Sequence, residues 1–236
     1  MDAEIRKFDS REEAIAFAGQ LISGALQAAL EDKGRASFCV SGGSTPGPLF
    51  DLLAETEIDW YRVTVGLVDE RWVPPEETSS NEWLVRSRLL TKHAGAAGLI
   101  PMWTADETPD EAVVDRNAAY EPHCDPLDVI LLGMGSDGHT ASWFPGSAGL
   151  ENALNPVGIG TIAAIDARGC PAAGINTQRL TLTGPAVGSA RVALLLLFGS
   201  DKLDVFGRAQ SAEPRDMPVR YAIDKLGPRL TVVWAP

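Results

Sequence analysis

Cysteine is scarce in this chain, and basic residues are outnumbered by acidic ones. The three cysteines, Cys39, Cys124 and Cys170, are widely spaced and form no C-x-x-C pair. This spacing predicts neither a disulfide framework nor a zinc site, so no metal is expected. The 32 acidic and 20 basic residues give a net charge of −12. Because binding to a polyanion needs a basic surface, neither a nucleic-acid partner nor an anionic membrane surface is expected.

Long apolar runs are also missing. The longest, Val192 to Phe198, is far shorter than the roughly 20 residues that span a bilayer. The first residues, MDAEIRKFDSREEA, are acidic and lack the apolar segment of a secretory signal. We therefore expect a soluble, cytoplasmic protein with no membrane partner. It would act as a monomer or a homodimer, two states that the sequence does not distinguish.

The remaining composition is that of a globular protein. Hydrophobic residues make up 45% and charged residues 22% of the 236 positions, both ordinary values for a folded domain. The chain has no internal repeat and no long linker rich in proline, glycine or serine. We expect residues 1–236 to form a single α/β domain, since this length suits one compact unit.

Helical and extended patterns alternate along the whole length. Ser10 and Glu13 can form a capping box before a helix whose apolar positions run from Ala14 to Ala29. Alternation of strands and helices predicts a mostly parallel sheet with helices on both faces. Further helices are predicted at 48–55, 82–90, 109–120 and 202–209, and strands at 36–40, 62–68, 128–132, 159–165, 192–198 and 229–234.

Small residues follow the first predicted strand, in the sequence Ser-Gly-Gly-Ser-Thr-Pro at 41–46. The backbone N–H groups of Gly42 and Gly43 can approach an anion closely, and Ser44 and Thr45 add hydroxyl donors. The alternative is an ordinary turn from strand to helix. The Walker pattern G-x-x-x-x-G-K-[ST] is absent, so a nucleoside triphosphate site is not predicted.

The segment after the predicted strand 128–132 also matches a glycine fingerprint. Residues 133–138 fit G-x-G-x-x-G, the pattern of dinucleotide-binding turns. That fingerprint needs a long helix beginning at the turn, whereas Pro145 and Gly146 follow after a few residues. We therefore do not predict a dinucleotide site.

Titratable side chains also gather at these predicted strand ends. Asp137 and His139 lie in the glycine-rich segment, and Asp69, Glu70 and Arg71 follow the strand at 62–68. A histidine at such a position can accept a proton near neutral pH. The alternatives are a structural histidine at 139 and a surface ion pair at 69–71. The other two histidines, at 93 and 123, are interpreted as structural.

Several of these segments together resemble a known family. Ser-Gly-Gly-Ser-Thr-Pro (41–46), Asp-Glu-Arg-Trp-Val-Pro (69–74) and Leu-Gly-Met-Gly-Ser-Asp-Gly-His-Thr-Ala-Ser-Trp-Phe-Pro-Gly (132–146) resemble the 6-phosphogluconolactonases of the glucosamine-6-phosphate isomerase/6-phosphogluconolactonase family. Ser-Asn (80–81), Arg-Leu-Thr-Leu-Thr (179–183) and Gly-Ser-Asp-Lys (199–202) follow the same family pattern. Each segment alone is weak support, but the ordered set spans nearly the whole chain.

The resemblance implies a modified Rossmann-like fold, similar to that of the deaminase and ribose-5-phosphate isomerase group. It also implies hydrolysis of 6-phospho-D-glucono-1,5-lactone in the oxidative pentose phosphate pathway, without a metal or organic cofactor. The small-molecule substrate would be the only partner required. The family's catalytic histidine corresponds to His139.

The same resemblance assigns substrate-binding positions. Phosphate contacts would come from Ser44, Thr45, Arg71, Arg179 and Lys202, and Asn81 belongs to the same set. Backbone N–H groups, of Gly42 or Gly43, would face the developing oxyanion. Either Asp137 or Asp69 would orient the imidazole, and the sequence does not choose between them.

Two other functions compete with this hypothesis. A glucosamine-6-phosphate deaminase would share the glycine turn and the Asp-Gly-His motif, but its pattern continues to Phe-Asn-Glu-Pro. This chain has Ser142-Trp143-Phe144-Pro145 and lacks that glutamate. A non-catalytic sugar-phosphate sensor would normally carry a DNA-binding module, for which the α/β unit leaves no residues.

Overall fold

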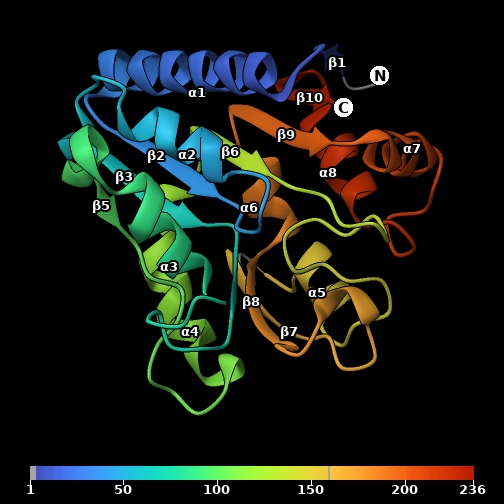
Figure 1. The fold of residues 1–236 in the computed structure, drawn as a ribbon. Helices are drawn as coiled ribbons and strands as arrows, with labels where there is room; N and C mark the ends of the chain where they lie inside the picture. The colour runs from blue at the N-terminus through green and yellow to red at the C-terminus, as the bar shows by residue number, and fades with distance from the viewer. Residues whose placement is uncertain (1–3, 159) are drawn as a thin grey trace.

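The computed structural model describes residues 4–158 and 160–236, which form two sheets. The larger one is fully parallel, with its seven strands in the order β1-β10-β9-β6-β2-β3-β5 (Figure 1). Its strands are β1 (Glu4–Lys7), β2 (Ala36–Val40), β3 (Val63–Leu67), β5 (Gly98–Leu99), β6 (Val129–Leu132), β9 (Val192–Phe198) and β10 (Leu230–Ala235).

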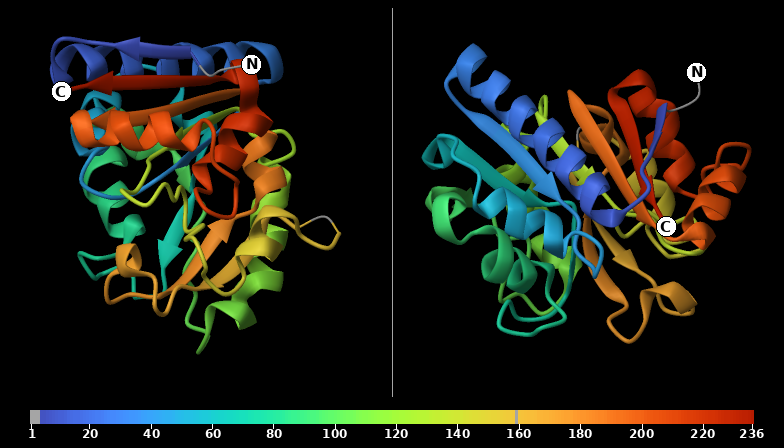
Figure 2. Two further views of the ribbon diagram at one scale, coloured as in Figure 1. Left: turned by 90° about the vertical axis from the view of Figure 1, so that its right-hand side faces the viewer. Right: turned by 45° about the horizontal axis from the view of Figure 1, so that its top comes forward.

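A smaller antiparallel sheet lies on the side of the parallel sheet away from the first helix (Figures 1 and 2). It has the order β4-β8-β7, with β4 (Asp69–Arg71), β8 (Gln178–Leu182) and β7 (Ile162–Asp166). Only Val68 separates β3 from β4 along the chain, and its carbonyl accepts the N–H of Leu182 at 2.8 Å. The chain therefore passes directly from one sheet into the other.

Helices cover both faces of the parallel sheet, as the alternating pattern predicted. The helices are α1 (Arg11–Lys33), α2 (Gly47–Ala54), α3 (Asn81–Leu84) with a π-helical turn at Val85–Leu89, α4 (Pro109–Tyr120), α5 (Leu150–Leu154), α6 (Gly184–Gly188), α7 (Ser200–Ala209) and α8 (Val219–Leu226). The helix α7 follows β9 along the chain and α8 precedes β10, and both helices lie at the right of Figure 1.

The longest helix, α1, crosses the parallel sheet and contacts β2, β6, β9 and β10 (Figure 1). Ser10 caps it by accepting the N–H of Glu13 at 3.2 Å, but the Glu13 carboxylate accepts from Asp9 rather than Ser10. The predicted capping box is therefore only half formed. By length and composition α1 would also qualify as a membrane span. Ala18 and Ile22 are nevertheless fully buried within the fold.

The central strands form where the sequence has short, continuous apolar runs. Every residue of β2 and β6 is buried, because a parallel strand covered on both faces meets no solvent. The predicted strand 159–165 corresponds to β7, which belongs to the smaller sheet, and its first residue lies outside the described part of the chain. Several elements had no counterpart among those predicted from the sequence: the strands β1, β4, β5 and β8 and the helices α5, α6 and α8.

Candidate active site

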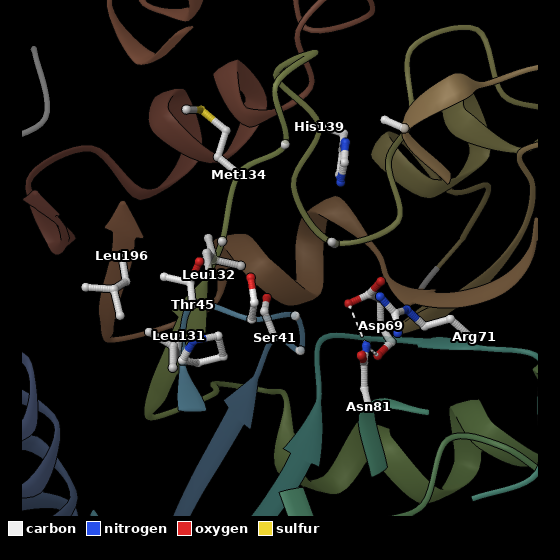
Figure 3. Close-up of a pocket in the computed structure, with 18 of the residues that line it drawn as sticks. Ser41, Thr45, Asp69, Arg71, Asn81, Leu131, Leu132, Met134, His139 and Leu196 are labelled. Atoms are coloured by element: carbon white, nitrogen blue, oxygen red, sulfur yellow. Dashed lines mark hydrogen bonds between the residues drawn. The ribbon is translucent and has the colours of Figure 1, made fainter. Parts of the chain in front are cut away.

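The predicted site residues converge on one cleft at the carboxyl ends of β2, β3, β6 and β9 (Figure 3). These ends meet because the strands are parallel and adjacent in the sheet. The cleft has a volume of about 280 Å³. Of the predicted residues, those that line it are Gly42, Gly43, Ser44, Thr45, Asp69, Arg71, Asn81, His139, Arg179 and Lys202.

Asp137 does not line the cleft but holds the imidazole of His139. His139 Nδ1 lies 2.5 Å from Asp137 Oδ1, and the same oxygen accepts the backbone N–H of His139 at 3.1 Å. An imidazole whose Nδ1–H donates to a carboxylate keeps the lone pair of Nε2 available for a proton. Burial of Asp137 favours a higher carboxyl pKa, but the hydrogen bond and charge of His139 outweigh it, and the pKa lies below its ordinary value.

The close fit of this pair depends on a glycine. A Cβ atom at Gly135 would lie 2.2 Å from both Cε1 and Nδ1 of His139 and 2.7 Å from Asp137 Oδ1. The backbone N–H of Gly135 also donates to the carbonyl of His139 at 2.8 Å. The glycine that resembles part of a dinucleotide fingerprint thus allows the loop to fold tightly around the imidazole.

The ring of Phe144 packs against His139 on another side. The two ring centroids are 4.4 Å apart with an interplanar angle of 44°. The guanidinium carbon of Arg179 lies 5.4 Å from the centroid of the same phenyl ring. Phe144 is only 1% exposed, so its ring is fixed between two cation-forming side chains.

The smaller sheet supplies two of the cationic residues. Arg71 on β4 and Arg179 on β8 are directly opposite each other in the antiparallel pairing. Arg71 Nη1 donates to the carbonyl of Ser79, which ties β4 to the loop before α3. Burial lowers the pKa of Arg179, and the neighbouring Arg71 charge lowers it too, while Asp69 opposes both.

Arg179 also has a structural role that its sequence motif did not indicate. Its Nε donates to the carbonyl of Asn176 at 2.6 Å, and its Nη2 donates to the carbonyl of Ala173 at 2.8 Å. Nη1 lies 3.8 Å from Asp69 Oδ2. Two of the donor groups of Arg179 therefore hold the loop before β8, and Nη1 is the group nearest to the Asp69 carboxylate.

Asp69 is the other carboxylate expected to orient His139, and the structure engages it elsewhere. Its Oδ2 accepts the hydroxyl of Ser142 at 2.6 Å, and its main-chain carbonyl accepts the Asn81 amide at 2.8 Å. Asp69 is 7% exposed and lines the cleft. The partner of His139 is therefore Asp137, whereas Asp69 joins the Ser142 loop to α3.

The adjacent Glu70 is fully buried and caps α3. Its carboxylate accepts the backbone N–H groups of Asn81 and Glu82, each at 2.7 Å, and the hydroxyl of Ser80 at 2.8 Å. Burial raises the carboxyl pKa of Glu70, and these hydrogen bonds only partly oppose the change. Glu70 positions Asn81 at the cleft, so its role is structural rather than that of a surface ion pair.

The loop at 41–46 fits against this helix. A Cβ atom at Gly42 would lie 1.9 Å from Asn81 Oδ1, so a side chain cannot be accommodated without moving Asn81. Gly43 has a φ angle of 95°, which L side chains rarely adopt. Glycine at both positions therefore lets the loop pack against Asn81 at the edge of the cleft, a geometry that fits an anion-binding loop and an ordinary turn alike.

Lys202 completes the cationic side of the cleft from the start of α7. Its Nζ donates to the carbonyl of Met134 at 2.8 Å, which connects α7 to the loop after β6. Partial burial lowers the pKa of Lys202, while Asp137 and Asp201 oppose that change. Ser44, Thr45 and Lys202 also border a second, open groove between α1 and α2.

Within residues 4–158 and 160–236, no group of three or more His, Cys, Asp or Glu side chains is arranged to hold a metal ion. After the fingerprint at 133–138, the next helix is α5, which begins at Leu150. The helix that a dinucleotide turn requires is thus not present at that point.

Sequence reasoning missed some residues of the cleft, including Ser41, Ala141, Ala172 and Phe144. Ala172 comes from the loop that Arg179 holds, a contact between distant parts of the chain. Phe144 lies within the quoted glycine-rich motif, and an aromatic residue five positions after His139 was the available signal. Its contact with both His139 and Arg179 depends on tertiary packing.

Taken together, the cleft offers a proton acceptor beside a group of cations and hydroxyl donors. His139 can accept a proton at Nε2, while Arg71, Arg179 and Lys202 can balance a doubly charged anion. Such an arrangement suits general-base chemistry on a phosphorylated small molecule.

The sequence of this chain is similar to those of a known family over nearly its whole length. Residues 9–234 match the family described as glucosamine-6-phosphate isomerases/6-phosphogluconolactonase. The chain is similar to 6-phosphogluconolactonase of Xylella fastidiosa (strain Temecula1), with 43% identity over 206 residues that cover 87% of this chain and 84% of that protein. It is also similar to 6-phosphogluconolactonase of Rhizobium meliloti, with 41% identity over 212 residues and 89% of each chain covered.

A solved structure has the same fold. The crystal structure of a 6-phosphogluconolactonase from Shewanella baltica superposes with a TM-score of 0.93 and 34% identity. The match covers 100% of this chain and 98% of that one. Both the two-sheet architecture and the strand ends that form the cleft therefore lie within the superposed region.

Proposed function

The chain belongs to the glucosamine-6-phosphate isomerase/6-phosphogluconolactonase family, and from this premise we propose that it hydrolyses 6-phospho-D-glucono-1,5-lactone to 6-phospho-D-gluconate. This is a step of the oxidative pentose phosphate pathway. The observation that carries the proposal is that His139, whose imidazole is held by Asp137, lines the same cleft as Arg71, Arg179 and Lys202.

His139 acts as the general base in the proposed reaction. Its Nε2 removes a proton from water while the water oxygen bonds to the lactone carbonyl carbon, and negative charge moves to the carbonyl oxygen. Asp137 keeps the proton on Nδ1 and balances the imidazolium charge. Backbone N–H groups of Gly42 or Gly43 stabilise the oxyanion.

Collapse of the tetrahedral intermediate completes the reaction. The bond between the carbonyl carbon and the ring oxygen breaks, and the imidazolium of His139 returns its proton to that oxygen. The products are one hydroxyl group and one carboxylic acid, so atoms and charge balance with water as the only co-reactant. Histidine is regenerated in its neutral form.

The phosphate group is bound by the cationic side of the cleft. A phosphomonoester carries about −1.5 to −2 charge at pH 7, and a protein with a net charge of −12 must supply cations locally. Arg71 and Lys202 do so together with the hydroxyls of Ser44 and Thr45. Arg179 contributes charge, but fewer free donors, because it also holds the loop before β8.

A direct assay tests the proposal. Purified protein should accelerate formation of 6-phosphogluconate above the spontaneous opening of the lactone, and it should not release ammonia from glucosamine 6-phosphate. His139→Asn should lower kcat by about 10²–10⁴-fold, the usual contribution of a positioned general base. The variant should still bind 6-phosphogluconate, because its phosphate contacts are intact.

Two results would overturn this assignment. Deamination without lactone hydrolysis would favour the isomerase-deaminase branch of the family, despite the sequence Ser142-Trp143-Phe144-Pro145. Binding of 6-phosphogluconate without any turnover would favour a sensor. If His139→Asn retained the wild-type kcat, the base would have to be sought among the carboxylates of the cleft.

A further inference from the structure

We infer that Phe144 is a positioning residue for His139: its ring holds the imidazole and stabilises the imidazolium cation that His139 becomes while it carries the proton of water. The inference rests on the role proposed above for His139. The ring centroids of Phe144 and His139 are 4.4 Å apart, within the range of a cation–π contact.

The burial of Phe144 makes this contact strong. Phe144 is 1% exposed, and the His139 side chain is 20% exposed. Water therefore screens the contact poorly, and cation–π attraction increases when the partners are desolvated. Because the ring has no charge of its own, it can favour the imidazolium without competing with the lactone for a proton.

Phe144 also connects the base to the anion-binding side of the cleft. The Arg179 guanidinium lies 5.4 Å from the centroid of the same ring. Arg179 is in turn held by two backbone carbonyls, so the phenyl ring is packed against a fixed cation. A ring immobilised in this way limits the orientations open to His139.

Substituting Phe144 by leucine removes the ring face and keeps the site apolar. We expect Phe144→Leu to lower kcat by about two- to thirtyfold, the fold-change that corresponds to a cation–π contact. The acid limb of the kcat/KM profile should move to lower pH, because the imidazolium loses a stabilising partner. The charged groups that also face this cleft or the imidazole are unchanged: Asp69, Arg71, Asp137, Arg179 and Lys202.

Three further variants make the result specific. Phe144→Tyr keeps the ring and should retain the wild-type acid limb. If Phe144→Leu folds poorly, Phe144→Met takes its place and should show the same loss of kcat and the same shift of the acid limb. Phe50→Leu makes the same chemical change at another fully buried position, on α2. It should reduce thermal stability and leave the pH profile unchanged.

An NMR titration separates this inference from the proposed function. The chain has three histidines, and the imidazole signal of His139 should titrate at lower pH in Phe144→Leu than in wild type, without any substrate. An unchanged or higher titration pH would overturn the inference, as would a kcat loss no larger than that of Phe50→Leu. A wild type that fails to hydrolyse the lactone would overturn the proposed function, while the titration would still decide whether Phe144 stabilises the imidazolium.

Discussion

Asp137 is the carboxylate that holds the imidazole of His139, through a 2.5 Å contact between Oδ1 and Nδ1. Asp137→Asn keeps the size of the side chain but removes the charge that balances the imidazolium. We expect kcat to fall by about ten- to a hundredfold or more, with a smaller change in KM, since partners that orient a catalytic group commonly contribute this much. Steady-state kinetics would measure it, with Asp166→Asn at another paired aspartate as the control.

The lowered carboxyl pKa of Asp137 also predicts a pH dependence of stability. A carboxyl whose pKa is lower in the folded than in the unfolded chain stabilises the fold above its unfolded value of about 4. That contribution is lost as the pH falls through the lowered folded value. The difference in unfolding free energy between wild type and Asp137→Asn should therefore shrink on acidification, which denaturant titrations at several pH values would measure. A constant difference would contradict the linkage.

Two glycines of the same loop provide a matched pair of substitutions. A Cβ atom at Gly135 would lie 2.2 Å from the His139 ring, whereas one at Gly133 would meet no atom within 4 Å. Gly135→Ala should displace the imidazole and lower kcat by about ten- to a hundredfold, because small misplacements at a reacting centre are costly. Gly133→Ala should be close to wild type in the same assay. Equal losses would indicate that the loop needs glycine for its backbone alone.

The sequence predicted individual site residues better than their partners. His139 and Arg71 were singled out by their positions after predicted strands, and Lys202 by the family resemblance of residues 199–202; all three line the cleft, and their roles stay predictions. The choice between Asp137 and Asp69 needed coordinates, since both are close to such ends. Phe144 was missed because its contact with Arg179 joins positions 35 residues apart, and no local pattern reports that distance.

Among the secondary-structure elements, α3 brings Asn81 to the cleft, and the Glu70 carboxylate caps the start of this helix. Glu70→Gln would place an amide N–H₂ group against backbone N–H donors of Asn81 and Glu82. We expect a loss of about 2–4 kcal/mol in unfolding free energy, since buried donors would be left without acceptors. Chemical denaturation would measure it, with Glu77→Gln on the exposed neighbouring loop as the control. A stability equal to wild type would show that α3 does not need the carboxylate.

Element types were predictable where the apolar runs were long enough. The parallel strands β2, β3, β6, β9 and β10 were all anticipated, and the fold class is confirmed. The strands β4 and β8 were not, because their residues, Asp-Glu-Arg and Gln-Arg-Leu-Thr-Leu, mix charged and apolar side chains over very few positions. β4 forms by pairing with β8, and β8 by pairing with both β4 and β7; pairing between distant segments leaves little trace in a local pattern.

For the whole molecule, ligand-induced stabilisation distinguishes the two interpretations of the glycine-rich loop. Millimolar 6-phosphogluconate should raise the Tm, because a ligand that binds only the folded state stabilises it. NAD or NADP at the same concentration should leave Tm unchanged, since no helix follows the fingerprint directly. Differential scanning fluorimetry would measure both. A shift with the dinucleotide alone would contradict the proposed site.

The opposed arginines of the smaller sheet have an energetic consequence for the free protein. Like charges directly opposite each other in an antiparallel pair repel, and Arg71 and Arg179 occupy such a position at the cleft. The unliganded protein is therefore destabilised by repulsion between these two guanidinium groups. A divalent anion bound between them would remove that repulsion, whereas chloride would reduce it only weakly. Part of the binding free energy for phosphate compounds would then come from relief of the repulsion between Arg71 and Arg179, in addition to the attraction between the anion and each arginine. Inorganic phosphate should accordingly raise the Tm of wild type more than that of Arg71→Met, at equal ionic strength.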